Sequence, residues 1–137
     1  MIKLTTKSVY GVIALTELAK YYGKKHIQIG DISKKHNIPH NYLEQLMVRL
    51  KKAGFIKSIR GAKGGYELAK QPHTIMLYDI ILFFEGKRDE SQTKNKFPIL
   101  NEYIYEAENE VRHVFSRSLQ DMVNDMQKYR QQYTYHI

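Results

Sequence analysis

Cysteine is absent from the 137 residues of this chain, and that absence removes several classes of site at once. Disulfides, thiol switches, thiolate zinc sites and cysteine-ligated iron–sulphur clusters all need a side chain that the chain does not have. Long apolar runs are also missing, since none approaches the ~20 residues that cross a bilayer. The N-terminus has the pattern of a helix start rather than of a cleaved leader, so we expect a cytoplasmic protein with no membrane partner.

Acidic residues are scarce in the first half of the chain. Residues 1–70 hold 14 Lys or Arg against 4 Asp or Glu, a balance of +10, whereas residues 71–137 hold 8 against 10, a balance of −2. This asymmetry predicts that the first half contacts a polyanion and the second half does not. A general solubilising bias is the alternative explanation of the charge alone.

The stretch from Ile29 to Leu68 has the order of parts of a helix-turn-helix followed by a β-wing. Residues 29–36 predict a first short helix, which ends before Pro39 because the residue preceding a proline avoids the α region. A second helix, capped by His40 or Asn41, is expected to run to about residue 53 and to stop at a glycine. Its predicted buried stripe, with i, i+3, i+4, i+7 spacing, is Leu43, Leu46, Met47 and Leu50.

Two short β-rich runs, residues 55–59 and 66–68, flank a loop with the sequence RGAKGG. Its glycines permit positive φ and a close approach of the backbone to another surface. Two alternatives to a DNA-binding wing exist. One is a plain glycine-rich hairpin with solvated charges. The other is a nucleotide phosphate loop, but that loop needs a following Lys-Ser/Thr and a helix, which the sequence does not supply.

Residues at the start of the second helix of a helix-turn-helix contact base edges in the major groove. Asn and Gln pair with adenine, and Glu accepts from the cytosine amino group. Because a carboxylate repels phosphates, we interpret Glu44 as a base contact, with electrostatic capping of the helix start as the alternative. Arg60 suits a minor groove, and Lys63 and Lys7 suit phosphates. The predicted DNA-binding residues are Lys7, His40, Asn41, Tyr42, Glu44, Gln45, Arg60, Lys63 and Gly64.

The elements on either side of this stretch complete the predicted DNA-binding domain, residues 1–86. A helix over residues 6–22, capped by Thr6, is expected to turn one apolar face inward. A short buried helix over residues 75–84 is expected to end at Gly86. Residues 87–96 are polar and predict a linker. The predicted inward residues of the first helix are Val9, Tyr10, Ile13, Leu18 and Tyr22.

Residues 97–137 predict one long helix, starting at Pro98 and running to about Tyr133. Apolar residues recur every 11 positions, a period that keeps the apolar stripe on one side of a straight helix. A helix roughly 50 Å long exceeds what this chain can cover by itself, so we expect pairing with a second copy. Packing within the monomer is the alternative. The predicted dimer contacts are Leu100, Ile104, Val111, Phe115, Met122 and Met126.

The residues LEQL at 43–46, followed by RGAKGGY at 60–66, closely resemble the bacterial IscR/NsrR/CymR family, also called the Rrf-two family. Lys7 with Tyr10, and the segment from Asp79 to Gly86, match its pattern as well. The resemblance is strong over residues 1–86 and is limited to a long-helix pattern over 97–137. It implies a winged-helix homodimer that binds operator DNA, usually as a repressor. By position, the family's base contacts correspond to residues 41, 42, 44 and 45, and its minor-groove arginine to Arg60.

The chain departs from many family members where they hold an iron–sulphur cluster on three cysteines, because residues 87–111 contain none. It resembles the cluster-free branch, some of whose members respond to a partner enzyme of cysteine synthesis. The six histidines are scattered without ligand spacing, so we expect no metal and no cofactor. The sequence shows no cluster of acid–base or nucleophilic residues, so we do not expect an enzyme.

The resulting expectation is a mainly α protein with a small β-wing, acting as a homodimeric, sequence-specific DNA-binding regulator, most simply a repressor on a palindromic operator. Two alternatives stay open. One is a regulator gated by a partner enzyme or a small-molecule effector. The other is an interaction module that acts only through its long helix. It predicts no salt-dependent DNA binding, whereas a protein that neutralises several phosphates should show a steep salt slope.

Overall fold

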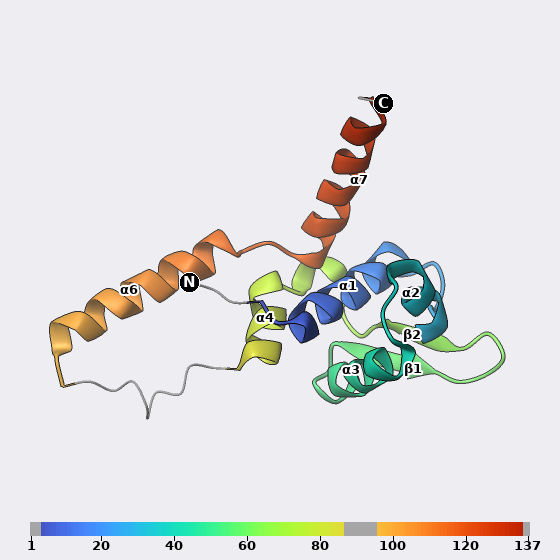
Figure 1. The fold of residues 1–137 in the computed structure, drawn as a ribbon, viewed down its shortest axis with the longest axis horizontal. Coiled ribbons are helices and arrows are strands. Elements are labelled where there is room, and N and C mark those ends of the chain that lie inside the picture. The colour runs from blue at the N-terminus through green and yellow to red at the C-terminus, as the bar shows by residue number, and fades with distance from the viewer. Residues whose placement is uncertain (1–3, 87–95, 136–137) are drawn as a thin grey trace.

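The computed structural model describes residues 4–86 and 96–135, so the predicted linker lies outside the described residues except for Lys96. Within these residues, most of the chain is helical and a small two-stranded antiparallel sheet lies at one side of the molecule, which confirms the predicted mainly α fold with a β-wing (Figure 1). None of the described helices combines the length and apolar content needed to cross a bilayer. The elements are α1 (Thr6–Lys20), α2 (Ile29–His36), α3 (His40–Lys52), β1 (Ile56–Ile59), β2 (Gly65–Leu68), the 3₁₀ turn η1 (Pro72–Thr74), α4 (Leu77–Glu85), α6 (Pro98–Val114) and α7 (Leu119–Tyr135).

Helices α2 and α3 form the predicted helix-turn-helix. Asn37 adopts a left-handed conformation, with φ of 53°, and redirects the chain between them. The four predicted stripe residues of α3 are all buried. The predicted cap at His40 or Asn41 is wrong, because α3 starts at His40 and its N-cap is Pro39, which makes no side-chain cap bond. The Pro39 carbonyl accepts from the Leu43 N–H at 3.0 Å instead.

The sheet pairs β1 with β2 in a register that sets Ile56 opposite Leu68. Ile27 extends this sheet by a single bridge to Tyr66, through N–H···O bonds of 2.9 and 2.8 Å. At this crossing the backbones lie so close that a Cβ on Gly65 would sit 2.6 Å from the Ile27 carbonyl oxygen. Glycine therefore lets β2 pack against the segment that leads into α2.

Helix α4 packs on α1 through Phe84 and Gly11. A Cβ on Gly11 would lie 2.1 Å from a ring carbon of Phe84, so the ring occupies the space that any larger residue would need. The predicted inward face of α1 is confirmed in part: Leu18 is buried, and Tyr10 and Ile13 pack against the core. It is wrong for Val9 and Tyr22, which are 40% and 38% exposed, and it missed the buried small residues, such as Gly11 and Ala14. The N-cap is Thr5 rather than the predicted Thr6, since the Thr5 hydroxyl accepts from the Ser8 N–H at 3.3 Å.

The predicted single helix from Pro98 to about Tyr133 is wrong. Two helices, α6 and α7, are separated at residues 115–118 and run in different directions (Figure 1). Leu119 and Val123 are buried in the same core as the winged helix. Helix α7 therefore packs on α1 and η1, while α6 has no buried residue and extends away from the core.

Local hydrogen bonds explain the break between α6 and α7. The Asp121 N–H donates to the Ser118 hydroxyl at 3.1 Å, and the Ser118 N–H donates to the Asp121 carboxylate at 2.9 Å, a reciprocal cap that starts a helix. Backbone bonds to the segment before α4 hold the break in place. The Leu77 N–H donates to the Arg117 carbonyl at 2.7 Å, and the Leu119 N–H donates to the Ile75 carbonyl at 2.9 Å. The 11-residue period continues across these residues although the helix does not.

Glu17 links α1 to the end of α2. Its side chain is 4% exposed, and its Oε1 lies 2.9 Å from Lys20 Nζ, 3.0 Å from Lys35 Nζ and 2.8 Å from His36 Nε2. Burial alone would raise the pKa of this carboxyl, but the hydrogen bonds from His36, Lys20 and Lys35 outweigh burial and lower the pKa from 4.5 to about 2. The carboxylate thus fixes the first helix of the helix-turn-helix against α1.

Replacement of Gly11 by Ala should lower the free energy of unfolding by about 1–3 kcal/mol, because the added methyl overpacks the contact with Phe84. Chemical denaturation followed by circular dichroism measures this change. Gly30→Ala in α2 is the matched control, since no atom lies within 4 Å of a Cβ built there. It should be neutral or stabilising by up to about 1 kcal/mol, the helix propensity gain. A Gly11→Ala variant as stable as Gly30→Ala would contradict the described packing of α4.

Acidification should remove the contribution of Glu17 to stability. The unfolded chain binds a proton at this carboxyl as the pH falls through 4.5, whereas the folded chain stays ionised to about 2. The stabilisation is therefore complete above pH 4.5 and declines toward pH 2. Denaturant melts of the wild type and Glu17→Gln should differ most above pH 5 and converge as the pH drops. A pH-independent difference would show that the charge of Glu17 is irrelevant.

Candidate nucleic-acid interface

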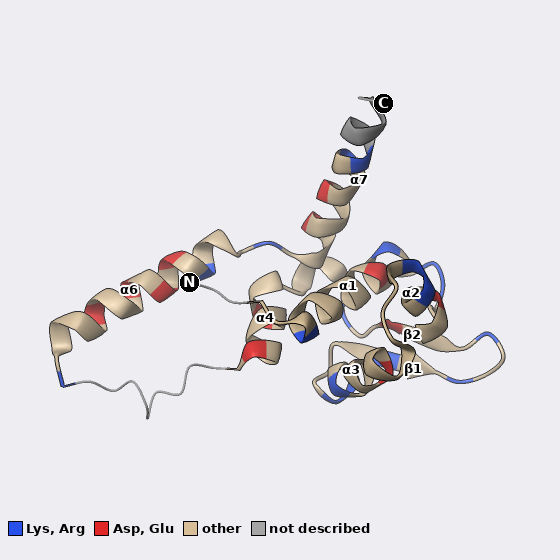
Figure 2. Cartoon of the chain, viewed as in Figure 1, with Lys and Arg blue, Asp and Glu red and all other residues tan. Residues whose placement is uncertain are grey.

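Helix α3 presents a polar face opposite its buried stripe. The side chains of His40, Asn41, Glu44 and Gln45 are all exposed, as expected for residues that contact DNA. In Figure 1, α3 lies below α1 while α7 rises above it, and the loop between β1 and β2 projects to the right of α3. Figure 2 colours Lys and Arg positions blue, and such positions occur on α3 and in this loop.

Tyr42 lies differently from the other predicted base contacts. Its side chain is half-buried, and its ring meets that of Tyr10 on α1 edge to face, with centroids 5.7 Å apart. The sequence interpretation placed Tyr42 on the exposed face of α3. The structure shows that much of the ring is used to seat α3 on α1.

The loop between β1 and β2 carries Arg60 and Lys63 as exposed side chains. Gly61 has φ of +116°, a conformation that L side chains rarely adopt. Gly64 is buried, its N–H donates to the Gly61 carbonyl at 2.9 Å, and a Cβ on it would lie 2.2 Å from the Ile59 carbonyl oxygen. Gly64 therefore shapes the loop from within, and its amide is already used inside the loop.

The start of α1 was predicted to hold a DNA phosphate near Lys7. In the structure, a carboxylate from α4 occupies the donors of this helix start. Glu85 Oε1 accepts from the Thr5 N–H at 2.9 Å, from the Thr5 hydroxyl at 2.8 Å and from the Ser8 hydroxyl. The Ser8 bond, followed by the Thr5 bonds, lowers the pKa of Glu85 below its ordinary value. Lys7 keeps a partly exposed side chain at this position, and Lys3 lies outside the described residues.

Two basic residues of α3 make contacts that the sequence did not indicate. Arg49 stacks over Phe83 and Phe84 of α4, with its guanidinium carbon 5.4 and 5.5 Å from the ring centroids. Lys51 donates from Nζ to the Ser58 hydroxyl on β1 at 2.7 Å. These contacts hold α3 in a fixed position relative to α4 and the wing. The two adjacent phenylalanines of α4 could have indicated the Arg49 contact from the sequence, since arginine stacks readily on aromatic rings.

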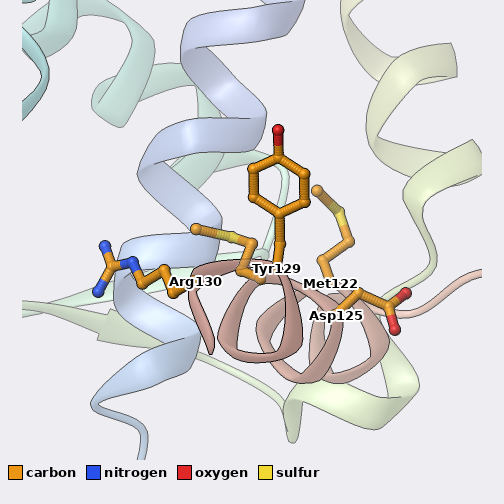
Figure 3. Close-up of a pocket in the computed structure, with 5 residues that line it drawn as sticks. Met122, Asp125, Tyr129 and Arg130 are labelled. Atoms are coloured by element: carbon orange, nitrogen blue, oxygen red, sulfur yellow. The ribbon is translucent and has the colours of Figure 1, made fainter. Parts of the chain in front are cut away.

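The predicted dimer contacts fall on two separate helices. Leu100 is 42% exposed, and Ile104 and Val111 are half-buried on the same face of α6. Phe115 is the C-cap of α6 and is half-buried. Met122 and Met126 lie on α7, where together with Asp125, Tyr129 and Arg130 they line an open pocket of about 380 Å³ (Figure 3).

Comparison with known proteins gives consistent matches. Residues 4–134 match the family model Rrf2, described as an iron-dependent transcriptional regulator. The chain is 44% identical over 84 residues to the HTH-type transcriptional regulator CymR of Bacillus subtilis, covering 61% of each protein. It is 35% identical over 94 residues to the regulator IscR of Vibrio campbellii, covering 69% of this chain and 56% of that one. The chain thus aligns with only about three-fifths of the length of these curated relatives.

Solved structures extend the similarity over most of the fold. The structure of CymR (YrzC), the global cysteine regulator of B. subtilis, has a TM-score of 0.77 and 34% identity, covering 90% of this chain and 98% of that one. The structure of T. potens IscR has a TM-score of 0.76 and 35% identity, covering 91% and 88%. Both similarities include the winged helix and the helices that follow it.

The family description names iron, and the residues of this chain do not fit a cysteine-ligated cluster. No cysteine exists to supply the thiolates. Within the described residues, no three His, Asp or Glu side chains gather in an alternative metal-binding group. The shared fold, the extent of the family match and the identity to named regulators nevertheless agree, and the chain belongs to the Rrf2 family of transcriptional regulators.

Proposed function

We propose that this chain is a homodimeric, sequence-specific DNA-binding repressor that binds a palindromic operator without an iron–sulphur cluster. The observation that supports it most is the exposed polar face of α3, set opposite a fully buried stripe and close to a loop with two exposed basic side chains. In this proposal residues 1–86 bind DNA, residues 97–137 provide the contacts between subunits, and residues 87–96 join them.

Base contacts come from the first turns of α3. Asn41 and Gln45 present amides suited to adenine, and the Glu44 carboxylate accepts from the amino group of cytosine. His40, the first residue of α3, belongs to the same set of base-edge contacts. Lys63 contacts a phosphate, and Lys7 does so beside the helix start that Glu85 occupies. Arg60 enters the minor groove from the wing. Tyr42 contributes its hydroxyl at the edge of the surface, and Gly64 acts indirectly by shaping the wing.

Helix α6 supports the dimer because it contributes no buried residue to its own chain. Its apolar face includes Leu100, Ile104 and Val111. Packing against the same face of a second chain would bury these side chains. Met122 and Met126 on α7 and Phe115 at the end of α6 complete the contact. Two copies of α3 would then lie about one DNA turn (~34 Å), or a multiple of it, apart on an inverted repeat.

The signal that controls binding forms a second part of the proposal. The similar structure from B. subtilis is described as the global cysteine regulator. We therefore propose cysteine availability as the first signal to test for this chain, delivered by a partner enzyme of cysteine synthesis or by a small-molecule effector. The test is to recover and sequence the genomic DNA fragments that the purified protein binds. An inverted repeat shared by these fragments would be the operator, and the functions of the genes beside it would indicate the signal.

Glu44→Ala should weaken operator binding roughly 5- to 150-fold and relax the preference at one base pair per half-site, because a base contact contributes about 1–3 kcal/mol of discrimination. Arg60→Ala should also weaken binding and reduce the slope of log affinity against log salt by about 1. Fluorescence anisotropy titrations over a range of salt concentrations measure both effects.

Lys128→Ala is the matched control for Arg60→Ala, since it removes one exposed positive charge from α7, which points away from α3 in Figure 1. It should bind the operator like the wild type. Wild-type affinity in Glu44→Ala or Arg60→Ala would overturn the assignment of that residue to the DNA surface.

Ile104→Asp should convert the dimer to monomers, because it places an unpaired charge on the apolar face of α6. The helical content and stability of the winged helix should change little, since α6 has no buried residue. Sedimentation equilibrium measures the oligomeric state. Tyr105→Asp introduces the same charge on another face of α6 and should remain dimeric. An Ile104→Asp variant that stays dimeric would remove α6 from the proposed interface.

A further inference from the structure

Val48 is an apolar side chain at the centre of the polar face of α3. It is 46% exposed, whereas the other large aliphatic side chains of this helix are buried. At ~100° per residue, Val48 lies about 140–160° around the helix from the buried residues Leu43, Leu46 and Leu50. It shares its stripe with Asn41, seven residues earlier, and with Glu44, four residues earlier.

The neighbours of Val48 on the helix surface are all polar. Glu44 and Gln45 lie one turn before it, and Lys51 and Lys52 lie one turn after it, all of them exposed. A single exposed valine is common on protein surfaces and needs no function by itself. This one, however, lies one turn after Glu44 and Gln45, which are proposed to contact bases, and it has basic residues one turn after it. The apolar patch around it is too small to seat a protein partner.

The major groove of DNA offers one apolar group to such a side chain, the C5-methyl of thymine. Four residues of helix rise about 6 Å, and successive bases are about 3.4 Å apart, so Val48 reaches about two base steps beyond the base contacted by Glu44. A branched aliphatic side chain can cover a methyl group there without leaving any polar group unpaired.

We propose that Val48 is a specificity-determining residue that packs against the methyl group of a thymine about two base pairs from the base bound by Glu44. This inference rests on the proposed function, because it requires α3 to lie in the major groove. It adds an apolar contact to a surface otherwise described by hydrogen bonds and charge. The operator should therefore contain a thymine that no polar residue of the protein distinguishes.

The test removes only the methyl group. An operator recovered by selection with the wild-type protein is synthesised with deoxyuridine in place of each thymine in turn, which leaves base pairing unchanged. One replacement per half-site should weaken wild-type binding about four-fold, the effect of one lost methyl-sized contact. Val48→Ala should bind the thymine operator more weakly by a similar factor and should show no further loss with deoxyuridine at that position.

Val9→Ala is the matched control, because Val9 is 40% exposed on α1, outside the face of α3. It should keep the full deoxyuridine effect. Val48→Thr, which retains the branched shape and one methyl group, should fall between the wild type and Val48→Ala.

Three outcomes decide the matter. Loss of the deoxyuridine effect in Val48→Ala alone supports the proposal. Wild-type binding that is indifferent to every deoxyuridine, or a Val48→Ala variant with an undiminished effect, overturns it while the operator and the Glu44 contact remain valid. A wild-type protein that selects no operator at all overturns the proposed function itself.

Discussion

The contact of the Phe84 ring with the bare backbone of Gly11 is the constraint on which the rest of the structure depends. It seats α4 on α1 without a side chain between them. Glu85, the next residue, then reaches the start of α1, and the neighbouring ring of Phe83 stacks under Arg49 of α3. Two backbone hydrogen bonds also join the start of α7 to the residues at the start of α4. One small residue thus sets the positions of three helices around the proposed DNA-binding surface.

The sequence predicted the helix-turn-helix well because large aliphatic residues mark one face of α3 at helical spacing. It was only partly right on α1, because much of that buried face is made of small residues such as Gly11 and Ala14, which a search for large apolar side chains passes over. The wing was predictable from its glycines. The site residues on α3 were placed correctly as exposed except Tyr42, whose partner Tyr10 comes from another helix and leaves no local signal.

The C-terminal half shows a different limit of periodicity. An 11-residue repeat continued from Leu100 to Tyr133, but the chain leaves the helix at residues 115–118 to bond with the segment before α4. Ser118 and Asp121 form a helix-capping pair that indicates a new helix start. The 11-residue repeat favoured one continuous helix instead, and the prediction followed the repeat. Charge counting has a similar limit. Lys20, Lys35 and Lys57 bind carboxylates of their own chain, so the basic half presents less free positive charge than its composition suggests.

The chain leaves the core after α4 and returns to it at Arg117, beside the first residue of α4. Helix α6 lies between these two points of the chain and contributes no buried residue to the core. Its length can change without moving α7 or any core residue, so insertions and deletions there meet no penalty from the winged helix. If this arm joins subunits as proposed, the spacing of the two halves of an operator could diverge between relatives while the proposed DNA-contacting surface stayed the same.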